Sequence, residues 1–113
     1  MPGIEKPDEI DVVAEDVDGS ALLSIIQAGE WSGSNAERER LKRKLRTYLR
    51  YALEGRMVAT YPTLEGRPVV IALMYEQPPP KSVLDYWAQR GRATARDGVT
   101  LRTASLADTV WRA

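Results

Sequence analysis

The run from Val69 to Tyr75 constrains the fold more than any other feature of this 113-residue sequence. Its side chains are apolar at odd and at even positions alike. Successive side chains of a strand point to opposite faces of a sheet, so a strand of this kind needs apolar cover on both faces. The sequence therefore predicts that this strand lies in the centre of a sheet.

Two short runs of β-branched and aliphatic residues come earlier in the chain. They cover Ile10–Ala14 and Ala21–Ile26, and they flank residues 16–19, which end in Gly19. Glycine adopts the positive φ that a tight turn requires without steric cost. This pattern predicts an antiparallel hairpin, and its second strand carries large apolar side chains on both faces.

The first helix is predicted to start at Ser34. Ser34 and Glu37 have the spacing of a capping box, in which a hydroxyl and a carboxylate accept hydrogen bonds from otherwise unpaired backbone amides of the first turn. Gly55 is the expected end of this helix. The apolar residues at helical spacing, which we expect to face the sheet, are Leu41, Leu45, Tyr48, Leu49, Ala52 and Leu53.

The second half of the chain carries weaker patterns. Residues 57–61 are predicted to form a loop, and Ser82–Arg90 a second helix that ends at Gly91. Val99–Thr103, after the turn at Gly98, is a candidate fourth strand.

Together these elements predict an α+β fold with the order ββαβα and a candidate final β. The sheet is expected to be antiparallel, built from the N-terminal hairpin, the central third strand and the candidate fourth, and packed with two helices. Residues 1–9 lack apolar periodicity and are predicted to be a mobile arm. Residues 10–113 are expected to form a single domain, in which 98–113 is the least defined part.

The composition removes the usual parts of many active sites. The chain has no cysteine and no histidine, so thiolate metal sites, disulfides and the commonest general base are all excluded. We predict no catalytic residue, no cofactor and no metal, and we lean against an enzyme. No apolar run approaches the length of a membrane span, and the lack of cysteine fits a reducing compartment, so a cytoplasmic protein without membrane contact is expected.

The charges are unevenly distributed along a chain of zero net charge. Residues 1–37 are strongly acidic, whereas 38–67 are strongly basic. Basic residues on one helix can neutralise nucleic-acid phosphates or bind an acidic partner. Cationic helix faces are also commonly just solvated, and the acidic hairpin can balance the charge here. The candidate polyanion- or partner-binding residues are Arg38, Arg40, Lys42, Arg43, Lys44, Arg46 and Arg50.

Four structural motifs carry a resemblance to a known family. They are the acidic hairpin leading to Trp31, the helix with Leu45-x-x-Tyr48-Leu49 that ends at Gly55, the turn Tyr61-Pro62, and the strand that begins Val69-Val70-Ile71 after Gly66-Arg67-Pro68. Over about residues 10–90 the chain resembles a family of small, uncharacterised bacterial α+β domains. This resemblance implies the fold and a bacterial origin, and it brings no catalytic residue.

Two hypotheses for the function remain open. Strands that are apolar on both faces need more cover than two helices provide, so the free face requires the C-terminal segment or a second copy of the chain. The tail offers only Leu106, Val110 and Trp111 as anchors. We therefore favour a non-enzymatic protein-interaction module that forms a homodimer. The alternative is nucleic-acid or polyanion binding through the basic first helix.

Overall fold

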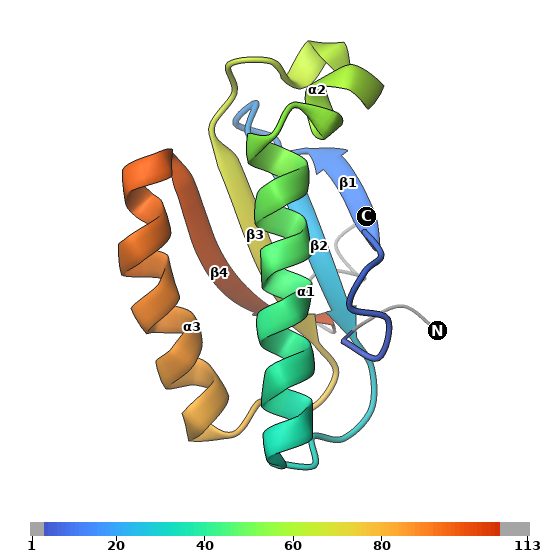
Figure 1. Cartoon of the computed structure of the whole chain (residues 1–113), viewed down its shortest axis with the longest axis vertical. Coiled ribbons are helices and arrows are strands. Elements are labelled where there is room, and N and C mark those ends of the chain that lie inside the picture. Colours follow the sequence, from blue (N-terminus) through green and yellow to red (C-terminus); the bar gives the residue numbers. More distant parts are fainter. Residues whose placement is uncertain (1–3, 107–113) are drawn as a thin grey trace.

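The computed structural model of the chain describes residues 4–106, which form one four-stranded sheet with helices packed against it (Figure 1). Residues 107–113, with Val110 and Trp111, lie outside the described residues. The elements, in chain order, are β1 (Val12–Glu15), β2 (Ala21–Gln27), α1 (Asn35–Leu53), α2 (Arg56–Thr60), a 3₁₀ turn (Pro62–Leu64), β3 (Val69–Tyr75), α3 (Lys81–Thr94), a second 3₁₀ turn (Ala95–Asp97) and β4 (Val99–Ser105).

The sheet is mixed, which corrects the prediction of an antiparallel sheet. The strand order is β1-β2-β3-β4; β1 and β2 are antiparallel, whereas β3 runs parallel to both β2 and β4. Parallel neighbours need a long crossover, usually a helix. Each connection here, from β2 to β3 and from β3 to β4, contains one long helix. The hairpin, the central position of β3 and the fourth strand are confirmed.

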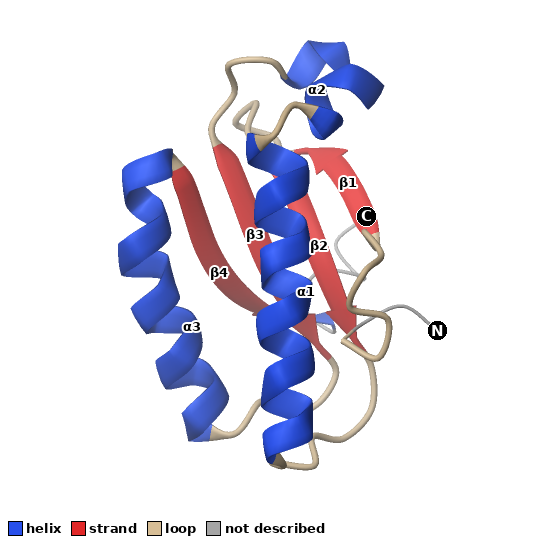
Figure 2. Ribbon diagram, viewed as in Figure 1, coloured by secondary structure: helices blue, strands red, loops and turns tan. Residues whose placement is uncertain are grey.

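Both long helices cover the same face of the sheet (Figure 2). Alternate strand residues point to that face and are buried, as the pairing of Leu23 with Ile71 in adjacent strands illustrates. The core lies between this face and the helices. Its largest fully buried apolar side chains, apart from Ile4 in the N-terminal segment, are Leu23, Ile25, Leu41, Leu45, Tyr48, Met57, Ile71, Leu73, Val83 and Val99.

The capping box at the start of α1 forms, and its carboxylate reaches further than expected. The Ser34 hydroxyl accepts a hydrogen bond from the Glu37 backbone amide at 3.1 Å. The Glu37 carboxylate accepts from the amides of Ser32 and Gly33, at 2.8 and 2.9 Å. The Ser34 hydroxyl therefore caps the first turn of the helix, and the buried Glu37 carboxylate fixes the loop that enters it.

Two helix boundaries differ from the predictions. Residues 56–60, mostly expected to be loop, form α2, because Gly55 in the left-handed conformation turns the chain and lets Met57 enter the core. The helix α3 continues through Gly91, where it was predicted to end. A Cβ at Gly91 would lie 3.6 Å from the Cβ of Leu101, so this glycine allows the helix to approach β4 closely.

Residues 4–9 pack against the rest of the domain, which differs from the mobile arm predicted for residues 1–9; residues 1–3 lie outside the described residues. Ile4 is buried in the core, and its amide donates a hydrogen bond to the Gln27 side chain at 3.1 Å. The Thr47 hydroxyl donates to the carbonyl of Pro7 at 2.7 Å. These anchors are one apolar side chain and backbone groups, which leave no periodic signal in the sequence.

None of the helices within residues 4–106 has the length and apolarity needed to cross a bilayer.

Replacing Leu45 tests which face of α1 is buried. It is 1% exposed, so Leu45→Ala should lower the unfolding free energy by about 2–5 kcal/mol through lost burial and the cavity left behind. Arg43→Ala is the control on the same helix, and it should cost less than about 1 kcal/mol because its ion pair is exposed. Equal losses in urea denaturation would contradict this helix orientation.

Candidate functional site

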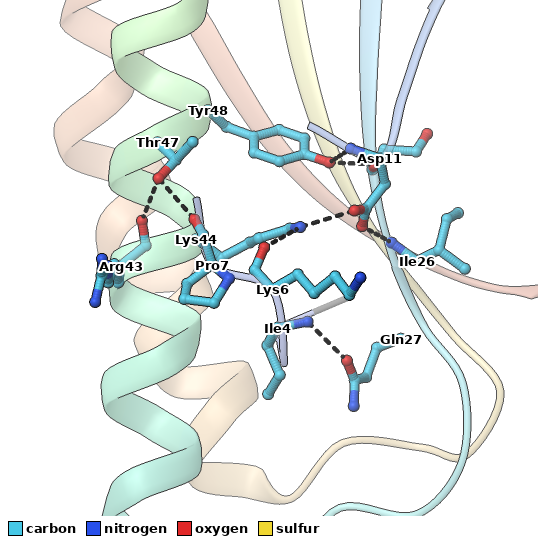
Figure 3. A network of polar contacts seen from close by, with 11 residues as sticks. Ile4, Lys6, Pro7, Asp11, Ile26, Gln27, Arg43, Lys44, Thr47 and Tyr48 are labelled. Atoms are coloured by element: carbon cyan, nitrogen blue, oxygen red, sulfur yellow. Dashed lines mark hydrogen bonds and ion pairs between the residues drawn. The ribbon is translucent and has the colours of Figure 1, made fainter. Parts of the chain in front are cut away.

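A buried ion pair joins α1 to the residues just before β1 (Figure 3). The Lys44 ammonium lies 2.7 Å from a carboxylate oxygen of Asp11, and the side chains are 0% and 1% exposed. The same ammonium donates a hydrogen bond to the carbonyl of Lys6 at 2.9 Å. Charges this deeply buried are tolerated only when they are paired and hydrogen-bonded.

Tyr48 completes this network from the next turn of α1. Its hydroxyl donates to the carbonyl of Ser24 at 2.7 Å and accepts from the Asp11 amide at 2.8 Å. The second carboxylate oxygen of Asp11 accepts from the Ile26 amide at 3.0 Å. Burial raises the pKa of Tyr48 well above its usual value. All these groups have partners within the fold, so the network holds α1 against the hairpin.

Two of the seven basic residues predicted as binding residues contact acidic residues of the N-terminal part of their own chain. Lys44 is buried in the network and has no free surface for a partner. Arg43, one residue earlier, makes two contacts to the Asp8 carboxylate, at 2.6 and 2.9 Å. Both side chains are directed to the N-terminal segment of their own chain.

Three further basic residues lie apart from one another. Arg38 contacts the Asn35 side chain in the first turn of α1. Arg40 lines a cavity of about 540 Å³ beside the carboxyl end of β2, together with Glu37 and Lys6. Among the described residues, its buried Nε has no hydrogen-bond partner. Arg50 is exposed in the last turn of α1.

The remaining two predicted residues, Lys42 and Arg46, line a groove between α1 and α3. The groove has a volume of about 330 Å³, and α3 contributes Tyr86 and Arg90 to it. The Lys42 ammonium lies 5.8 Å from the centre of the Tyr86 ring. Sequence reasoning missed the two α3 residues, although their spacing of four residues already places them on one helix face.

The electrostatics of the groove are dominated by its cations. Burial raises the pKa of Tyr86, while the charges of Arg90 and Arg46 act in the opposite direction. The phenol therefore stays protonated at neutral pH and remains a hydrogen-bond donor. Lys42 is paired with Glu39 at 3.3 Å, and both side chains are exposed.

The face of the sheet away from the helices carries a second hollow, of about 250 Å³. Ser24 and Ala72 form its floor, because both residues are small and buried in the middle strands. Arg102 of β4 and Asp16 of the hairpin turn form an ion pair at 3.1 Å. Since β2 and β3 separate these two residues in the sheet, the ion pair crosses this face.

Within residues 4–106, no three acidic side chains gather closely enough to hold a metal ion.

The comparison with protein families shows which family this chain belongs to. A family of unknown function, DUF6572, matches residues 2–107. The chain belongs to this family. The match confirms the resemblance to an uncharacterised domain family and extends it beyond residues 10–90 to residues 2–107, which include β4. A bacterial origin stays a prediction. Among curated proteins and among solved structures, no match was found.

The ion pair predicts a strong coupling between Lys44 and Asp11. Lys44→Met leaves the Asp11 carboxylate buried without its partner, so we expect a loss of about 3–5 kcal/mol in unfolding free energy. Adding Asp11→Asn removes that charge and keeps an acceptor for the Ile26 amide. The double variant should therefore lose less than the sum of the single variants in urea denaturation. Additive losses would show that the two groups do not interact.

The raised pKa of Tyr48 predicts that the unfolding free energy falls at alkaline pH. Burial raises the pKa of its phenol in the folded chain above the usual 10.0, so the unfolded chain loses this proton first. The corresponding stabilisation is complete below pH 10 and decreases as the pH rises beyond it. Tyr48→Phe should therefore flatten the fall of unfolding free energy above pH 10, measured in urea. Tyr61→Phe, at an exposed site, is the control, and equal slopes for wild type and Tyr48→Phe would contradict the assignment.

Proposed function

We propose that this domain is a non-enzymatic protein-interaction module that forms a homodimer through the face of the sheet opposite α1 and α3. One observation carries the proposal: this face is apolar. Its side chains are Val12 and Ala14 in β1, Leu22, Ser24 and Ile26 in β2, Val70, Ala72 and Met74 in β3, and Thr100, Arg102 and Ala104 in β4. All of them except Ser24, Thr100 and Arg102 are apolar.

A sheet with one solvated face normally alternates apolar and polar residues along each strand. The central strands do not alternate here. Leu22, Ile26, Val70 and Met74 point away from the helices and are only partly buried, and Val12 at the edge of the sheet is 42% exposed. A largely apolar face of this kind, crossed by the ion pair of Asp16 and Arg102, is typical of a surface that binds another protein.

A second copy of the chain is the partner that can cover the whole of this apolar face. A twofold dimer places the same patch on both sides of the interface, so apolar side chains of one copy meet apolar side chains of the other. The hollow above Ser24 and Ala72 offers a recess for a larger side chain, and Met74 at its rim is a candidate to fill the recess of the partner copy. Well-packed recesses of this kind commonly supply most of the binding energy of an interface.

The alternative function, polyanion binding, concerns the opposite side of the molecule. The basic side chains that remain free for it lie on α1, whereas the apolar face lies behind the sheet. Variants on one side therefore leave the other side unchanged, and the two functions can be tested separately.

Light scattering or sedimentation at micromolar concentration tests the dimer. We expect wild type to have twice the mass of one chain, and Val70→Glu with Met74→Lys to be a folded monomer because these changes place charges in the apolar interface. Leu84→Lys is the matched control: Leu84 is 40% exposed on α3, outside the proposed interface, and the variant should remain a dimer. A monomeric wild-type protein would overturn the proposal. It would indicate that the C-terminal segment covers this face instead.

A further inference from the structure

We propose that the groove between α1 and α3 binds the phosphate backbone of a single-stranded nucleic acid, with Arg46 and Arg90 as the principal phosphate contacts. The groove, defined by Lys42, Leu45, Arg46, Leu49, Tyr86 and Arg90, has cationic and aromatic walls above two leucines. This inference goes beyond the proposed homodimer and concerns the opposite side of the domain.

The charge of the groove is not neutralised by the fold. Within the part of the chain that the structure describes, no acidic side chain lines the groove, and neither Arg46 nor Arg90 makes an ion pair or a side-chain hydrogen bond. Lys42 has only the exposed contact to Glu39 at 3.3 Å, which water and salt weaken. An incoming anion therefore meets three cations and displaces only a weak pair.

Elsewhere, several acidic residues of the N-terminal segment and hairpin already pair with other cations, as Asp8 does with Arg43 and Asp16 with Arg102. Ionic pairs within the fold thus balance charge in one region and leave the groove positive.

Tyr86 adds two interactions suited to a nucleotide. Its hydroxyl has no hydrogen-bond partner among the described residues, and burial keeps it protonated despite Arg90 and Arg46, so it can donate to a phosphate oxygen. Its ring lies only partly buried beside the Lys42 ammonium. Cations next to an aromatic ring are the combination with which single-stranded nucleic acids are held, because every base has a face that can stack.

The length of the basic row favours a strand over a single phosphate ion. Arg38, Lys42, Arg46 and Arg50 follow one another at intervals of four residues on α1. At 1.5 Å of rise per residue, this row is about 18 Å long, enough to contact several consecutive phosphates. A row of cations beside a partly exposed aromatic ring suits a strand of nucleotides, whose phosphates and bases use both features.

Fluorescence anisotropy of the full chain with a labelled single-stranded oligonucleotide, as DNA and as RNA, tests the proposal. We expect binding at low ionic strength, and a plot of log K against log salt with a slope of about −2, since each of three phosphate contacts contributes about −0.7. Arg46→Gln with Arg90→Gln should make the slope shallower by about 1.4. No binding of either oligonucleotide at low salt would overturn the proposal.

A charge-matched pair of variants separates the groove from general attraction. Arg46→Glu with Arg90→Glu should weaken binding more than tenfold. Arg56→Glu with Arg92→Glu makes the same change of charge at exposed positions outside the groove and should change binding less than threefold; circular dichroism confirms that both variants fold. Equal losses in the two pairs would overturn the site. Polyglutamate competing as well as the oligonucleotide would show that the groove binds acidic proteins and would overturn the nucleic-acid assignment.

Discussion

The position of α1 depends on one buried ion pair. Lys44 and Asp11 are almost completely inaccessible, and their mutual attraction would not offset the loss of hydration without the surrounding hydrogen bonds. The Lys6 carbonyl, the Ile26 amide and the Tyr48 hydroxyl supply contacts around the two charges. Because these groups come from the N-terminal segment, β2 and α1, one network fixes three parts of the chain relative to each other.

The basic residues of α1 fall into two groups according to their position around the helix. Lys44 and Arg43 face the N-terminal segment, where Asp11 and Asp8 neutralise them. Lys42 and Arg46 lie on the other side of the helix, toward α3. The basic residues of this helix, which the sequence presents as one set, thus divide into a group used for folding and a group with free charge.

Local signals in the sequence were sufficient for much of the fold and for little of the site. The hairpin turn, the cap at Ser34 and the two-sided apolar strand β3 each depend on neighbouring residues, and all three are confirmed. Strand direction depends on pairing between distant segments, so the parallel contacts of β3 were missed. For the same reason, the sequence could identify Lys44 as basic but could not place Asp11 beside it, nor bring Tyr86 to the groove.

The parallel pairing explains why the domain has two different surfaces. Crossovers between parallel strands are almost always right-handed, and β2, β3 and β4 follow one another in a single direction across the sheet. Two successive crossovers in one direction therefore place α1 and α3 on the same face, as Figure 1 shows. The groove lies between these two helices, and the same geometry leaves the opposite face without a helix among the described residues. The basic groove and the apolar face are thus two consequences of one topology.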